Sequence, residues 1–178
     1  MADYFKGRIE IGGRVPHHLK DQLIKEIRSA HAAEGDDWGG SPFQPSTVDE
    51  LKALAEENEG NIVLCDDAAR YGEFDSLEEF LAKNDIGFSR HSDAHDELDA
   101  ERVEFRPGWD KPRVFNSNAA GDTVVSLREL REKVFPLLKA DVKSAAQAQW
   151  FAADALLALR RMTGDDITPL QDIVFEKP

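Results

Sequence analysis

The hydrophobic period changes from two to that of a helix within the first 30 residues, and this change constrains the fold most strongly. In residues 5–12, apolar side chains and glycines alternate with polar side chains, which is typical of a half-buried strand. Its buried side is expected to hold Phe5, Gly7, Ile9 and Ile11. Gly12 and Gly13 interrupt this pattern. Leu19, Leu23 and Ile27 then recur at helical spacing, which predicts an amphipathic helix that begins near Pro16.

Further helices and strands alternate along the next 60 residues. Ser46 to Asp49 form a capping arrangement that opens a helix ending near Asn58. The apolar run 62–65 predicts a central strand, Asp66 and Asp67 predict a turn, and residues 70–74 are expected to return antiparallel. Ser76 and Glu79 fit the start of a helix, and a strand follows from Ile86.

The last third of the chain extends the sheet and then becomes helical. Residues 101–106 alternate like a strand, and residues 113–116 and 123–125 predict a hairpin. A capping box at 126–129 opens a helix. A long helix is expected over 141–162, with one inward face. That face is predicted to hold Val142, Ala146, Trp150, Ala153 and Leu157.

This order of elements predicts an α+β fold. We expect an antiparallel sheet with helices packed on one face, built on a ferredoxin-like (split βαβ) core and extended by a C-terminal hairpin and a long helix. With 178 residues, 41% of them hydrophobic, the chain is long enough for one sizeable core, so residues 1–178 are predicted to form a single domain.

Cysteine usage and the N-terminal segment predict a cytoplasmic protein. The single cysteine, Cys65, excludes an intramolecular disulfide and lies in an apolar run, where a buried and reduced thiol is expected. The first residues lack the cationic and apolar segments of a secretion signal, and every window long enough to span a bilayer contains charged residues. A membrane partner is therefore not expected.

Charge balance restricts the partners further. The chain has 35 acidic and 22 basic residues, a formal net charge of −13. A negative field repels phosphates, which argues against direct nucleic-acid binding and favours a basic protein partner. Solubility alone would also account for this charge. A homodimer is compatible with the sequence.

The densest polar cluster is the segment 90–99, where His91, Asp93 and His95 recur at a spacing of two. On one face of an extended strand, two imidazoles and a carboxylate can converge on a divalent metal. A metal-dependent hydrolase would use these three residues, with Asp66 or Glu73 as a further ligand or base. A solvated acidic loop between two strands would have the same sequence pattern. With such a loop, no cofactor is expected.

A second group of carboxylates could hold magnesium for phosphoryl chemistry. It comprises Glu10, Asp66, Asp67 and Glu73, at the ends of predicted strands. Aspartates are also good turn residues because they hydrogen-bond to their own backbone. The turn is the simpler interpretation.

Two features favour a protein-binding surface. Trp38 and Phe43 lie in a Gly/Pro-rich loop beside Asp36 and Asp37, and such aromatic residues often dominate interface energetics. They would equally serve to cover an edge of the core. The second feature is an acidic run with the irregular spacing of a phosphate-backbone mimic, which a solvated hairpin tip would also show. Its members are Asp93, Asp96, Glu97, Asp99, Glu101 and Glu104.

These patterns lead to two functional hypotheses. The first is a non-enzymatic acidic module that binds a basic protein, such as an inhibitor that mimics nucleic acid. The alternative is the metal-dependent hydrolase. Neither a nucleophile elbow nor a complete phosphate-binding loop occurs in the sequence.

Overall fold

The computed structural model describes residues 3–34, 43–94, 99–118, 122–140 and 142–177. The chain divides into two compact units. Unit 1 comprises Met1–Val114 and Pro169–Pro178, and unit 2 comprises Phe115–Thr168. The expectation of a single domain stays a prediction.

A five-stranded sheet of order β3-β1-β4-β5-β6 contains the main strands of unit 1, and its last strand continues into unit 2. Its strands are β1 (Tyr4–Gly12), β3 (Ile62–Arg70), β4 (Gly87–Ser92), β5 (Ala100–Phe105) and β6 (Arg113–Ser117). Strands β3 and β4 both pair antiparallel with β1, and β5 pairs antiparallel with β4. The predicted α+β class with an antiparallel sheet is therefore confirmed, whereas the ferredoxin-like detail stays a prediction.

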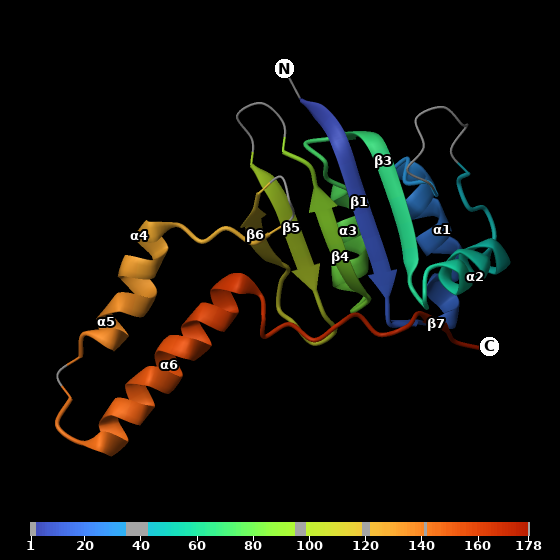
Figure 1. Ribbon diagram of the computed structural model, residues 1–178. Helices are drawn as coiled ribbons and strands as arrows, with labels where there is room; N and C mark the ends of the chain where they lie inside the picture. Colours follow the sequence, from blue (N-terminus) through green and yellow to red (C-terminus); the bar gives the residue numbers. More distant parts are fainter. Residues whose placement is uncertain (1–2, 35–42, 95–98, 119–121, 141, 178) are drawn as a thin grey trace. The chain divides into compact units, whose positions relative to one another are not determined.

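The helices of unit 1 cover one face of this sheet (Figure 1). They are η1 (His17–Leu19), α1 (Lys20–Ser29), α2 (Val48–Glu57) and α3 (Asp75–Lys83). The strand alternation sends Ile9, Ile11 and Phe88 into the core between sheet and helices, as expected. The helices contribute buried residues at helical spacing, including Leu23, Leu54 and Leu77.

Strand β3 continues through the position where a turn was expected. Asp66 and Asp67 lie within β3, and the strand predicted over 70–74 does not form. The pairing of β3 with β1 shifts register between Phe5 and Gly7, and Asp66 Oδ1 accepts a hydrogen bond from the Ala68 amide at 2.9 Å. The aspartate does bond to its own backbone, but the result is a β-bulge and not a turn.

Two helix starts differ slightly from their predicted form. Thr47 caps α2 in a complete capping box with Glu50, one residue beyond the predicted Ser46. Helix α3 begins at Asp75 without a side-chain cap. Instead, Glu78 Oε1 accepts a hydrogen bond from the Phe74 amide at 3.1 Å, which satisfies one of the free N–H groups at this helix end.

The C-terminal tail belongs to unit 1. Strand β7 (Val174–Phe175) pairs parallel with β2 (Arg14–Val15). The Gly13 amide donates to the Gln171 carbonyl at 2.7 Å, and the Ile173 amide donates to the Gly60 carbonyl at 2.7 Å. These backbone bonds join the tail to segments more than 100 residues earlier in the chain.

Unit 2 is mainly helical. Its elements are α4 (Leu127–Glu129), the π-helical turn η2 (Leu130–Val134), α5 (Phe135–Leu138) and α6 (Ala145–Thr163). The predicted capping box is present between Ser126 and Glu129, and α6 ends at Gly164, which has a left-handed φ of 80°. Ser117 and Thr123 form the bridge of the predicted hairpin. No helix in the part of the chain described combines the length and the apolar character needed to cross a membrane.

The predicted inward face of α6 is wrong. Trp150 is 59% exposed and Leu157 is 42% exposed, while Ala155, on another side of the helix, is buried. From Ser144 to Leu159 the only charged residue is Asp154, so α6 is apolar on more than one side. Spacing alone therefore could not show which apolar side contacts the neighbouring helices η2 and α5.

Candidate functional site

A buried arginine lies at the centre of the most unusual polar cluster in unit 1. Arg90 shares the helix-covered face of β4 with Phe88, and its side chain is only 3% exposed. Its Nε lies 3.0 Å from Glu78 Oε1 of α3, and its Nη2 donates to Glu101 Oε1 of β5. Because a buried charge is costly without partners, this pairing fixes α3 to the sheet.

The carboxylates around Arg90 show the effect of burial. Burial raises the pKa of Glu78, although the positive charge of Arg90 acts in the opposite direction. The pKa of Glu73 is also raised, first by burial and then by a side-chain hydrogen bond with Asp75 that favours the protonated form. Three carboxyl groups, those of Glu73, Glu78 and Glu101, thus interact with one guanidinium.

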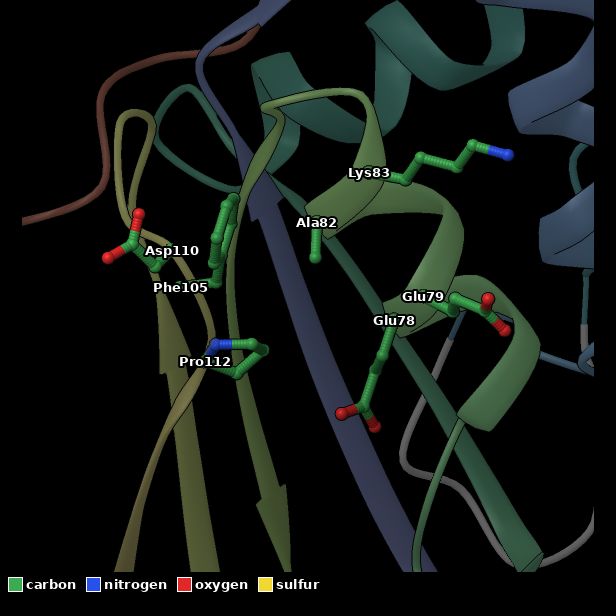
Figure 2. Close-up of a pocket in the computed structure, with 7 residues that line it drawn as sticks. All are labelled: Glu78, Glu79, Ala82, Lys83, Phe105, Asp110 and Pro112. Atoms are coloured by element: carbon green, nitrogen blue, oxygen red, sulfur yellow. The ribbon is translucent and has the colours of Figure 1, made fainter.

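A pocket of about 390 Å³ opens beside this cluster, between α3 and the chain that follows β5. Its lining residues are Glu78, Glu79, Ala82, Lys83, Phe105, Asp110 and Pro112. In Figure 2, Glu78 lies between α3 and the strands, Phe105 and Pro112 form the opposite wall with Asp110 beyond them, and Glu79 and Lys83 extend away from the strands.

The lining of this pocket, which we call the α3 pocket, suits an amphipathic cation. Its apolar wall can contact the hydrocarbon stem of a lysine or arginine side chain, and its three carboxylates exceed its one ammonium group. A phosphate or a carboxylate would be repelled by the same groups. The lining of the α3 pocket is therefore chemically compatible with a basic side chain.

The opposite face of the sheet holds a second charged network. Glu104 is buried, accepts a hydrogen bond from Ser89 Oγ, and lies 2.8 Å from Arg106 Nη2 and 3.5 Å from Arg102 Nε. Its charge is matched by two arginines, and its Oε2 is hydrogen-bonded to Ser89 Oγ. We therefore interpret this network as structural.

The three residues of the predicted metal site are only partly described. His91 lies on the same face as Glu104, and Asp93 follows the end of β4, whereas His95 lies outside the described residues. The pKa of His91 is lowered, mainly because neighbouring groups desolvate the ring, and the charges of Arg102 and Arg8 add to this effect. Among the residues that the structure describes, no group of three or more His, Cys, Asp or Glu side chains could hold a metal ion. The His91–Asp93–His95 site stays a prediction.

The predicted magnesium group is not assembled. Glu10 pairs across the sheet with Val63, Asp66 pairs with Gly7, and Glu73 belongs to the Arg90 cluster. Glu10 Oε1 instead accepts a hydrogen bond from Asn61 Nδ2 at 3.0 Å. All of these carboxylates are described, so this hypothesis is wrong.

The predicted binding surfaces stay predictions. Asp36, Asp37 and Trp38 of the first surface lie outside the described residues, and Phe43 is 45% exposed. In the acidic run, Asp96 and Glu97 also lie outside, while Asp93 and Asp99 are exposed. Glu101 and Glu104 point to opposite faces of β5, and each contacts an arginine.

Arg90 is the residue that sequence reasoning missed. The signal was present, because Ile86, Phe88 and Arg90 alternate at a spacing of two and so share one face. That face was correctly predicted to be the core face for the first two residues. The α3 pocket left no comparable signal, since Glu78 and Asp110 are far apart in the sequence.

Comparison with known proteins gives no relative for this chain: no protein-family model, no curated protein and no solved structure matches it.

Proposed function

We propose that this chain is a non-enzymatic protein-binding module whose acidic unit docks on a basic partner protein. The partner class that fits best is a nucleic-acid-binding protein, which the module would inhibit by occupying its phosphate-binding face. The observation that carries the proposal is the α3 pocket, where carboxylates lie beside an apolar wall.

The distribution of charge supports this proposal. Unit 2 contains seven acidic and seven basic residues, so its formal net charge is zero. The net charge of −13 therefore belongs entirely to unit 1. A field concentrated in this way accelerates encounter with a positively charged protein and repels polyphosphates.

The α3 pocket would supply specificity that net charge alone cannot. A lysine or arginine of the partner would place its stem against Phe105 and Pro112 and its charged end near Asp110. Docking of this kind removes the basic side chain from water on one side only, which limits the desolvation cost.

We also place the module in the cytoplasm. The chain has a single cysteine, Cys65, which is buried, and one cysteine without a second to form a disulfide suits a reducing compartment.

A bait experiment with the full chain tests the proposal. Wild type and the variant D110N/E79Q are immobilised, host proteins are captured at low salt, and the basic protein retained by the wild type is purified and titrated against each bait. We expect the variant to bind it about tenfold more weakly or worse. The matched control is E56Q/E57Q, which removes the same charge from two exposed positions on α2.

Two results would refute the docking proposal. One is equal binding by all three baits, since that would leave the α3 pocket without a role. The other is a complex of the module and the purified partner that is neither weakened by salt nor displaced by duplex DNA.

A further inference from the structure

Helix α6 exposes an apolar stripe that the rest of unit 2 does not cover. Its members are Ala146, Trp150, Ala153 and Leu157, all of them exposed. The steps between them are four, three and four residues, which is the spacing of a coiled-coil seam. We call this set the α6 stripe.

The interior of unit 2 is too small to explain so apolar a helix. Ala155 is the buried residue of α6, and Val134 is the buried residue of the segment from α4 to α5. Helices that are apolar on several sides are normally covered on several sides. Exposed apolar residues also concentrate here, since Leu127, Leu138, Val142, Leu156 and the two large members of the α6 stripe all belong to unit 2.

The α6 stripe is complementary to itself. If two α6 helices cross antiparallel about a twofold axis between Phe151 and Ala152, Trp150 faces Ala153 of the other copy. In the same arrangement Leu157 faces Ala146 of the other copy. Each large side chain thus meets a small one, and the contact repeats by symmetry, as a twofold interface requires.

Local charge also favours a second copy over the basic partner. The α6 stripe contains no charged residue, and unit 2 as a whole is neutral. A basic partner finds no complementary charge on the α6 stripe, whereas two copies can meet there with no like charges inside the contact.

We propose that two copies of this chain associate through the α6 stripe as an antiparallel, twofold-symmetric pair. The 19 residues of α6 span about 28 Å, so the helix pair alone makes a small interface. Association is therefore expected at micromolar concentrations of the full chain, and it does not depend on the proposed docking function.

Sedimentation equilibrium of the full chain over a range of concentrations tests this pairing. Wild type is expected to dimerise reversibly, and Leu157→Glu to weaken dimerisation about tenfold or more. Leu156→Glu is the matched control, because it places the same charge one residue away on a different side of α6 and should leave dimerisation nearly unchanged.

A size exchange identifies the occupant of the α6 stripe. Trp150→Ala should weaken the dimer by leaving a cavity, and Ala153→Trp should weaken it by placing two tryptophans opposite each other. The double variant W150A/A153W restores a large residue opposite a small one and should dimerise more tightly than either single variant. Circular dichroism confirms that each variant is folded.

Three outcomes would overturn the pairing. The first is a wild type that stays monomeric at every concentration. The second is a loss of dimerisation in Leu156→Glu as large as that in Leu157→Glu. The third is a double variant that associates no better than the single variants.

Discussion

At the scale of single residues, Arg90 links three elements of unit 1. It extends from β4 to Glu78 of α3 and Glu101 of β5, and its side chain is almost fully buried. An ion pair of this kind adds little to the free energy of unfolding, compared with apolar residues in place of both partners. Removal of one partner alone is costly, because it leaves an uncompensated charge. Arg90 therefore supplies the positive charge that compensates Glu78 and Glu101, which are both partly buried.

Replacement of Arg90 by alanine should destabilise the protein strongly. We expect the free energy of unfolding to fall by about 3–5 kcal/mol, because Glu78 and Glu101 lose their counterion. Chemical denaturation followed by circular dichroism measures this change. Arg128→Ala is the comparison, since the Arg128–Glu132 pair is 2.9 Å long but exposed, and its loss should cost about 0.5 kcal/mol or less. Equal effects of the two substitutions would contradict the assigned role of Arg90.

The raised pKa of Glu73 predicts a specific pH dependence of stability. The folded state binds this proton more tightly than the unfolded chain, so the stabilisation is complete below the ordinary value of 4.5 and is lost as pH rises through the raised pKa. In Glu73→Gln the amide can donate to Asp75 as the protonated carboxyl does. The unfolding free energy of the wild type relative to this variant should therefore decrease from about pH 4 to about pH 7. A difference that is constant or increases with pH would show that burial does not control this group.

At the scale of elements, the bulge between β1 and β3 depends on two glycines that approach each other. A Cβ at Gly7 would lie 2.6 Å from the Gly72 carbonyl oxygen, and a Cβ at Gly72 would lie 2.4 Å from Ser92 Cβ. Gly72 also has a φ of 67°, which side chains disfavour. This close approach allows β3 to end beside β1 and the chain to turn toward α3.

Gly72→Ala should therefore destabilise unit 1 by about 1–3 kcal/mol, through both backbone strain and steric overlap. Thermal and chemical unfolding measure this change. Gly108→Ala is the matched control, because Gly108 has a similar φ of 84° but a Cβ there would meet no atom within 4 Å. If the two variants lose the same stability, strain alone explains the effect and the close packing contributes nothing.

The sequence predicted an element best where its hydrophobic pattern was compatible with one structure only. The alternation in β1 and the helical spacing of α1 identified their buried residues correctly, because one side of each is apolar and the other polar. The turn at Asp66 was wrong because its local hydrogen bond is compatible with both a turn and a bulge. The inward side of α6 was wrong because the helix offers more than one apolar side.

The site was harder to predict than the fold. The alternation that places Ile86 and Phe88 in the core also places Arg90 there, but its carboxylate partners come from α3 and β5, and only the packing of those elements brings them together. The α3 pocket likewise joins residues from α3, β5 and the segment after β5. Contacts of this kind depend on tertiary structure and leave no spacing in the sequence.

At the scale of the whole molecule, charge and apolar surface are separated along the chain. Unit 1 carries the full net charge of −13, and unit 2 is neutral and exposes most of the large apolar side chains described as exposed. Salt should therefore affect the two proposed interactions differently.

An increase in salt from about 0.1 M to about 1 M shortens the Debye length from about 10 Å to about 3 Å. Binding of the basic partner to unit 1 should weaken steeply over this range, whereas the dimerisation constant should stay unchanged or rise, because it depends on apolar contact. Calorimetric titration measures the first quantity and sedimentation equilibrium the second. A dimer that dissociates at high salt would contradict the neutral character assigned to the α6 stripe.

The α6 stripe and the α3 pocket belong to different units of the chain, and this has a consequence for avidity. Under the two proposals together, a pair joined through α6 contains two α3 pockets, and a partner with two basic patches would have two sites to bind. The second contact then forms at an effective concentration fixed by the tether and not by the concentration of the free chain, which is commonly millimolar for short connections. Each pocket alone would bind a basic side chain weakly, but two pockets together would bind a surface with repeated basic patches much more tightly.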